Sequence, residues 1–178
     1  MSGDKKFFSY NQIHRIVEST VGACKDYEPD VIVAIGGGGY IPARMLRTAL
    51  KVPVLAVSLE LYNDTNSRNR EVEIRQWFDE AYGTGRLVRG KRVLVVDEVD
   101  DTRTTLAYTV NELVARHSPA SVAVMVVHNK DKVKAGVLPD NVVYIAGSHV
   151  DDCWVCYPWD AHCYGMSIEA CDAEACRG

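Results

Sequence analysis

The stretch KRVLVVDEVDDTRTT, residues 91–105, shows most clearly how this chain is organised. Residues 91–97 are mostly apolar and β-branched and end in an acid, which predicts a strand buried on both faces of a sheet. Apolar residues then recur at helical spacing and predict a helix over 104–117. The side chains predicted to face inward from that helix are Leu106, Val110, Leu113 and Val114.

Residues 97–105, between strand and helix, carry four carboxylates and three hydroxyls. An ordinary helix start uses Asp or Thr as a cap, which explains one or two of these seven side chains. The positive end of a helix and its free backbone N–H groups also form a seat for phosphate, to which threonine hydroxyls add donors. Carboxylates just upstream can accept hydrogen bonds from sugar hydroxyls or attract a hard divalent cation.

Outward from this stretch, strands alternate with helices. A helix over 10–26 starts with Ser9 and Gln12 in capping-box spacing, and Pro42 suits the first turn of another. Further strands are predicted over 30–35, 53–59, 121–128 and 142–146. The pattern predicts one α/β domain spanning 1–178, with a mostly parallel sheet flanked by helices. Because ligands bind beyond the carboxyl ends of such strands, the glycines after Ile35 and the acids after Val96 should share one rim.

Four glycines, Gly36 to Gly39, follow the strand over 30–35. The loop does not fit a dinucleotide-binding fingerprint, because Ile41 stands at the third glycine position, and it lacks the Gly-Lys-Ser/Thr ending of a P-loop. Residues without a Cβ can adopt positive φ and let backbone N–H groups approach a diphosphate. A tight strand-to-helix turn is the alternative interpretation.

Composition limits the partners. The net charge of −4 and the pI near 5.7 argue against nucleic-acid or anionic-membrane binding. Neither a secretory signal nor an apolar run long enough to span a membrane is recognisable, so a cytoplasmic location is the default expectation, with the six cysteines reduced. Cys153 and Cys156 have C-x-x-C spacing, but zinc would need two more ligands, for which only His149, His162 and Cys163 lie close in sequence.

The 91–105 stretch, together with IGGGGYIPAR over 35–44, resembles the type I phosphoribosyltransferases, and most closely the fungal hypoxanthine-guanine and xanthine enzymes. The resemblance covers about 9–60 and 88–160. It implies the type I phosphoribosyltransferase fold and a purine salvage activity. The 5-phosphoribosyl group of 5-phosphoribosyl-1-diphosphate (PRPP) would pass to N9 of hypoxanthine, guanine or xanthine, and pyrophosphate would leave. The sequence does not rank these three bases.

The resemblance assigns roles around the sugar phosphate. Asp97 and Glu98 would hold the ribose hydroxyls directly or through Mg²⁺, and Asp101 would act as general acid or base near N7 of the purine. The remaining implied contacts to PRPP are the 5′-phosphate cradle Thr102, Arg103, Thr104 and Thr105, and the pyrophosphate-binding Gly37 and Gly38. The family's strained, sometimes cis, peptide would fall at Gly36–Gly37. Arg103 departs from the commoner family form, which has glycine there.

The resemblance also assigns the purine contacts. Lys130 would donate to O6, and because an ammonium has no acceptor, adenine with its 6-amino group should be rejected. Trp154 would stack on the base and the carbonyl of Val155 would meet its edge. Asp160 would complete the shell of Mg²⁺ and pyrophosphate. A solvated surface lysine and a core tryptophan are the alternative interpretations of Lys130 and Trp154.

Residues 60–86 are too long for a simple connection and correspond to a flexible hood in the family, while 150–178 would form the base-binding segment and tail. Trp77 and Phe78 within the hood could instead anchor a neighbouring subunit, since the resemblance implies a homodimer or homotetramer. Two other classes stay open: a catalytically silent regulator that binds the same ligands, and, less favoured, a Rossmann-type oxidoreductase.

Overall fold

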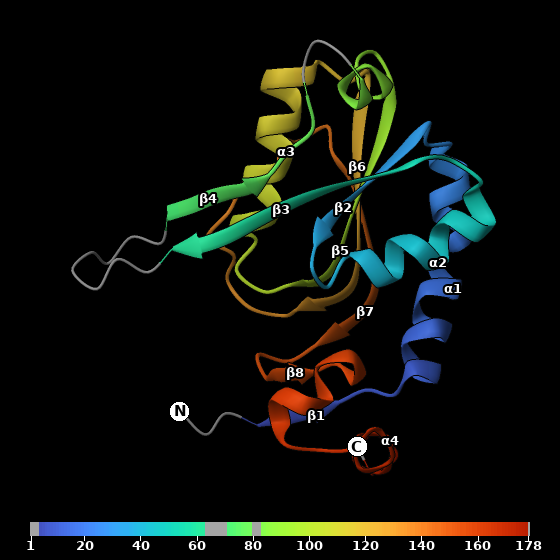
Figure 1. The fold of residues 1–178 in the computed structure, drawn as a ribbon, viewed down its shortest axis with the longest axis vertical. Helices are drawn as coiled ribbons and strands as arrows, with labels where there is room; N and C mark the ends of the chain where they lie inside the picture. Colours follow the sequence, from blue (N-terminus) through green and yellow to red (C-terminus); the bar gives the residue numbers. More distant parts are fainter. Residues whose placement is uncertain (1–3, 63–70, 80–82, 178) are drawn as a thin grey trace.

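A computed structural model describes residues 4–62, 71–79 and 83–177. Its centre is a six-stranded sheet of order β4-β3-β2-β5-β6-β7, in which all neighbours are parallel except β3 and β4 (Figure 1). The strands are β2 (Val31–Gly36), β3 (Val54–Tyr62), β4 (Glu71–Gln76), β5 (Arg92–Asp100), β6 (Ser121–Lys130) and β7 (Val143–Val150). The predicted α/β architecture with a mostly parallel sheet is confirmed.

Helices cover both faces of this sheet (Figure 1). α1 (Tyr10–Tyr27) and α2 (Tyr40–Leu50) lie together on one face, and α3 (Thr104–His117) lies on the other. The capping box at the start of α1 is formed: the backbone N–H of Gln12 donates to the Ser9 hydroxyl (3.2 Å), and the Gln12 side chain accepts from the backbone N–H of Ser9 (2.8 Å).

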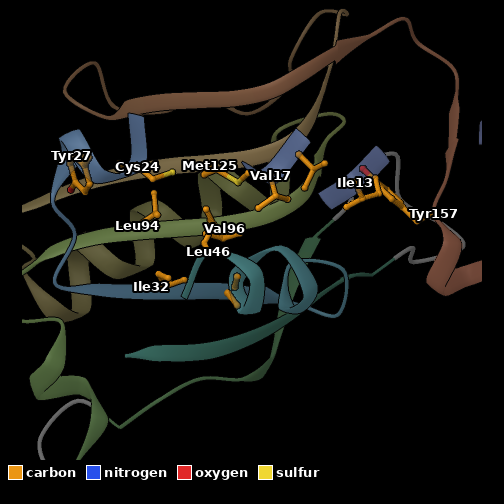
Figure 2. Close-up of a cluster of buried hydrophobic side chains, with 14 of the residues drawn as sticks. Ile13, Val17, Cys24, Tyr27, Ile32, Leu46, Leu94, Val96, Met125 and Tyr157 are labelled. Carbon is orange, nitrogen blue, oxygen red and sulfur yellow. The ribbon is translucent and has the colours of Figure 1, made fainter. Parts of the chain in front are cut away.

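Each face has its own hydrophobic core. Figure 2 shows the core under α1 and α2, where Cys24 lies beside Leu94 and Val17 lies beside Met125 of the sheet. On the α3 face, Leu106, Val110 and Leu113 are buried as predicted, but Val114 is 48% exposed, so its predicted burial was wrong. The reason is the helical period: the next inward position after Leu113 is His117, and Val114 lies beside the stripe.

A small lobe completes the chain (Figure 1). β1 (Lys5–Phe7) pairs in parallel with β8 (Trp154–Cys156), and η2 (Pro158–Tyr164) and α4 (Ile168–Ala175) follow. None of these elements was predicted. The lobe joins the core under α1 through Phe8, Val155 and Tyr157, and Figure 2 shows Tyr157 beside Ile13 at the end of the row of labelled side chains. Val155 and Tyr157 therefore pack this lobe against the core of the main sheet.

Part of the predicted hood is regular structure. β4 pairs antiparallel with the end of β3, with Ile74 opposite Leu59, so 71–76 extend the sheet instead of forming a loop. Trp77 and Phe78 pack on His117 of α3, and the Trp77 indole N–H donates to His117 Nε2 (2.9 Å). η1 (Thr84–Leu87) leads into β5. The rest of the hood prediction, 63–70 and 80–82, lies outside the described residues. Among the described residues no helix is long and apolar enough to cross a membrane.

Candidate active site at the carboxyl ends of the strands

The two acids after Val96 lie on β5 itself. The sequence predicted that this strand ends at Asp97, but pairing with β6 continues through Val99–His128 and Asp100–Asn129. The Asp97 carboxylate is buried and accepts from the backbone N–H of Glu98 (2.9 Å). Burial, followed by the nearby charge of Glu98, raises the pKa of Asp97 well above its ordinary value. The acids are thus fixed by the sheet ladder.

The glycine loop closes over these acids. β2 ends at Gly36, and the Gly36–Gly37 peptide is cis, as the resemblance implied. A Cβ at Gly38 would collide with the carboxyl group of Glu98, and one at Gly39 would lie 2.5 Å from the carbonyl oxygens of Ile35 and Val96. Glycine is therefore required here for close approach between β2 and β5. The loop is more than a tight turn, because it seats the Glu98 side chain.

Residues 97–106 line a cavity of about 330 Å³, together with Ile35, Gly36, Leu59 and Glu60. The hydroxyls of Thr102 and Thr104 lie 3.0 Å apart, and no side chain caps the start of α3. The first turn of α3 is therefore left to be completed by another group, and its positive end favours an anion. This geometry matches a seat for phosphate.

Arg103 has an unusual backbone for a residue with a side chain. Its φ of 65° is left-handed, a conformation that glycine adopts readily, which accounts for glycine in the commoner family form. The side chain forms an ion pair within the protein: Nε and Nη2 each lie 2.8 Å from Oδ2 of the fully buried Asp100. The guanidinium also lies 4.8 Å from the centre of the Tyr144 ring. The structure therefore does not bring Arg103 forward as a phosphate donor.

Arg103→Gly is expected to lower the free energy of unfolding by about 2–4 kcal/mol. Glycine relieves about 1 kcal/mol of left-handed backbone cost, but loss of one partner of a buried ion pair costs about 3–5 kcal/mol. Urea denaturation measures the difference. Ser118→Gly is the matched control, because Ser118 (φ 48°) shares the backbone conformation and no side-chain bond is lost. That variant should match or exceed wild-type stability, and an Arg103→Gly protein equally stabilised would contradict the expectation.

Asp101 is held between two lysines. Its Oδ1 lies 3.1 Å from Lys130 Nζ and 3.0 Å from Lys132 Nζ, and Lys132 also contacts Asp152 (2.8 Å). Burial alone would raise the pKa of Asp101, but the hydrogen bonds and charges of Lys132 and Lys130 outweigh it and lower that pKa. The carboxylate is therefore ionised at neutral pH. Lys130 is 91% buried, so it is not a solvated surface lysine.

The small lobe carries the remaining predicted residues, Trp154, Val155 and Asp160. Trp154 is 59% exposed, so the core interpretation of this side chain is wrong, whereas Val155 is buried. Burial, then the charge of Glu98, raises the pKa of Asp160, which shows that these two carboxyl groups influence each other. Among the described residues no group of three or more Asp, Glu, His or Cys side chains is arranged to hold a metal alone. Asp97, Glu98 and Asp160 therefore do not form a complete metal site by themselves, and neither do Cys153 and Cys156, the residues of the zinc alternative.

Tyr157 links the small lobe to β5. Its hydroxyl donates to the backbone carbonyl of Glu98 (2.8 Å) and lies 2.8 Å from Nδ1 of the buried His128. Burial, followed by the charge of Lys6, lowers the pKa of His128 to about 4, so the ring is neutral and Nδ1–H donates to Tyr157. Sequence reasoning missed this pair, and also Lys132, Lys134 and Tyr144, whose hydroxyl donates to Asp100 (2.6 Å).

Comparisons with known proteins agree with this geometry. The family described as phosphoribosyl transferase domain matches residues 9–162. The hypoxanthine-guanine phosphoribosyltransferase of Saccharomyces cerevisiae is 39% identical over 90% of this chain and 87% of its own length. Xanthine phosphoribosyltransferase 1 of the same yeast is 41% identical over 89% and 90%. A hypothetical protein from Neisseria gonorrhoeae, crystallised with bound ppGpp, is 38% identical with a TM-score of 0.88, covering 100% of this chain and 99% of that one.

The chain belongs to the phosphoribosyltransferase family. The resemblance stated from the 35–44 and 91–105 motifs is therefore confirmed, and so is the family fold. Membership makes the chain an enzyme of the glycosyltransferase class.

Proposed function

We propose that the protein is a purine salvage enzyme that transfers the 5-phosphoribosyl group of PRPP to N9 of hypoxanthine, guanine or xanthine. The observation that carries the proposal is the Asp101–Lys130 pair (3.1 Å) beside the cavity lined by 97–106. A 6-oxopurine presents N7 and O6 side by side along one edge. The names of the yeast relatives support the same class of base.

Each part of the site has a distinct task in this proposal. Thr102 to Thr105 and the first turn of α3 bind the 5′-phosphate, while the backbone of Gly37 and Gly38 binds the diphosphate. Asp97 and Glu98 face the ribose.

The purine is held by a second set of residues in this proposal. Lys130 orients the base through O6, Trp154 covers it, and the carbonyl of Val155 meets its edge. Asp101 takes a proton from the purine as N9 attacks C1′. Positioning and electrostatic stabilisation of the leaving pyrophosphate supply most of the catalysis.

Mg²⁺ fits the donor set of this rim. The pKa values of Asp97 and Asp160 are raised by burial and then by the charge of Glu98, so a cation placed among the three carboxylates would relieve their repulsion. Mg²⁺ commonly takes one or two protein carboxylates and completes its shell with phosphate oxygens and water, which suits such a sparse set. When bound, it would neutralise charge on the diphosphate. Asp97, Glu98 and Asp160 are the residues proposed to hold it.

The hood over 60–86 is proposed to close over PRPP and exclude water from the reacting carbon. Glu60, the first residue of this segment, lines the cavity, which supports the proposal. Trp77 and Phe78 pack on α3 of the same chain, which favours an internal anchor over a subunit contact. A homodimer or homotetramer in the cytoplasm remains part of the proposal, to be tested by sedimentation and by localisation of a tagged chain.

The relative crystallised with bound ppGpp makes this nucleotide a candidate second ligand of the protein. ppGpp is a guanosine carrying two diphosphate groups, so its base could meet Lys130 while a diphosphate occupies the seat at Thr102 to Thr105. We propose that it competes with PRPP. Saturating PRPP should abolish ppGpp inhibition in steady-state assays. Inhibition that persists at saturating PRPP would place the nucleotide elsewhere.

The first test is pyrophosphate release from PRPP and Mg²⁺ with hypoxanthine, guanine, xanthine, adenine or no base. The expected result is release that depends on at least one 6-oxopurine and is absent with adenine. This result would also identify the substrate. Saturable PRPP binding without base-dependent release would instead support the catalytically silent regulator.

Tyr157→Phe is expected to lower kcat about tenfold, equivalent to about 1.4 kcal/mol. The hydroxyl ties the purine-binding lobe to the carbonyl of Glu98, so its loss should let the base and the ribose shift relative to each other. The stability should fall by about 1–3 kcal/mol. Steady-state kinetics and urea denaturation measure the two effects.

Tyr27→Phe is the matched control. The Tyr27 hydroxyl bonds Ser121 (2.8 Å) at the opposite end of β6. Its loss should lower stability by about 1 kcal/mol and leave kcat unchanged. If both variants lose turnover in proportion to stability, the link through Tyr157 has no specific effect on the site.

A further inference from the structure

Lys134, four residues beyond the end of β6, is a largely buried cation with an unusual set of partners. Its side chain is 12% exposed, and Nζ donates to the backbone carbonyls of Asp100 (2.6 Å), Asp101 (3.0 Å) and Lys130 (2.8 Å). An ammonium has three donors and no acceptor, so three carbonyls use its full capacity. Nζ also lies 3.6 Å from Oδ1 of Asp100.

These carbonyls lie where the ladder between β5 and β6 stops. The last paired residues of the two strands are Asp100 and Asn129. Asp101 and Lys130 come next, with no ladder pairing between them in the register of the two strands. Lys134 bridges their carbonyls in place of a ladder bond and so continues the connection of the two strands by one residue.

The side chains of the two bridged residues meet at the proposed purine edge, with Asp101 Oδ1 3.1 Å from Lys130 Nζ. We propose that Lys134 is a positioning residue that fixes the spacing of Asp101 and Lys130, and thereby the alignment of N7 and O6 of the base. The kinetic consequence rests on the proposed function. Misplacement of a reacting group by about 1 Å can cost about 10²-fold in rate, so a clamp on these two residues should matter although it never touches substrate.

The test compares Lys134→Met, which removes the donors and keeps a chain of similar length, with Lys134→Arg, which keeps a cationic donor. For Lys134→Met we expect kcat/KM for the 6-oxopurine to fall about 10–100-fold, with a higher purine KM and a lower kcat. The Kd for PRPP should stay within about twofold, since the phosphate seat at Thr102 to Thr105 keeps its own side chains. Lys134→Arg should recover part of the loss, which a purely space-filling role would not allow.

Lys91→Met is the matched control, because Lys91 is half-exposed and lies 3.9 Å from Asp30 at the other end of β5. It should leave all kinetic constants unchanged. Wild-type kinetics in Lys134→Met would overturn the proposal, as would an equal loss of PRPP affinity. If Lys134→Met does not fold, Lys134→Gln takes its place, because its shorter side chain is uncharged and keeps only two amide donors. A smaller loss of kcat/KM in the same direction would support the proposal, and wild-type kinetics would overturn it.

Hydrogen exchange gives a readout that does not depend on activity. In Lys134→Met, the amides of 99–102 and 128–131 should exchange faster than in wild type, while those of 31–36 should not. Unchanged exchange at both strand ends would overturn the clamp even if the enzyme loses turnover. A wild-type protein without base-dependent pyrophosphate release would instead reject the proposed function and leave the exchange result to decide on the clamp.

Discussion

Asp101→Asn is expected to lower kcat about 10²–10⁴-fold, the range typical of general acid–base catalysis. Lys132 and Lys130 hold the carboxylate ionised at neutral pH, ready to accept a proton from the base. Asparagine keeps the shape but cannot take up that proton. Because the role belongs to the transition state, kcat and kcat/KM should fall together with KM unchanged. Steady-state kinetics with saturating PRPP measure this.

Asp131→Asn is the control for this variant. Asp131 is a neighbouring carboxylate that bonds His149 of β7 (2.8 Å) and Asn129 of β6 (3.1 Å). Its replacement should leave kcat within about twofold, well below the factor of 10² or more expected of a general base. A rise in KM for Asp101→Asn with kcat preserved would show that Asp101 only binds the base and would remove its catalytic role.

The strongly periodic elements could be predicted from sequence because their signals are local. The helix over 104–117 has the predicted bounds, and the strands after residues 30 and 120 were found from continuous apolar runs. β4 was missed although Val72 and Ile74 alternate with charged residues. That alternation is a strand signal, but 60–86 was predicted only as a hood and no strand was assigned within it.

Other elements depend on contacts that leave no local pattern. β1 and β8 are three residues each, and Lys5 pairs with Trp154 across most of the chain. The end of β5 was placed too early because its acids look like a turn, whereas pairing with β6 keeps them in the ladder as far as Asp100. Such short or polar strands are defined by their partners, which a single sequence does not reveal.

The residues of the site also fall into those that a local motif predicts and those that only the topology brings together. Asp97 to Thr105 are contiguous, so their chemistry was visible as one motif. Lys132, Lys134 and Tyr144 meet this motif only because the sheet places β6 and β7 beside β5. Buried Asp100 also explains the position of Arg103. The charge of Arg103 was expected near phosphate, but it forms an ion pair with Asp100 inside the protein. A motif predicts the residues that face the ligand, while their supports come from the topology.

Lys130→Ala should lower the ratio of kcat/KM for a 6-oxopurine to kcat/KM for adenine by about 10–100-fold, since a charged hydrogen bond is worth about 1.5–3 kcal/mol. The buried ammonium offers donors only, so it matches O6 and opposes the 6-amino group of adenine. Its removal should lower kcat/KM for the oxopurine and leave that for adenine equal or higher. Competition assays with the two bases at saturating PRPP measure the ratio directly.

Lys132→Ala separates recognition of O6 from electrostatic support of Asp101. Both lysines contact Asp101 Oδ1 at nearly equal distances, 3.1 Å for Lys130 and 3.0 Å for Lys132. Loss of the Lys132 charge should therefore change turnover with every base by a similar factor, because the carboxylate loses a partner that lowers its pKa. Only Lys130 is proposed to reach the purine edge, so the ratio between oxopurine and adenine should change in Lys130→Ala alone. An equal change of that ratio in both variants would mean that selectivity arises from Asp101 and its ionisation, and not from a donor to O6.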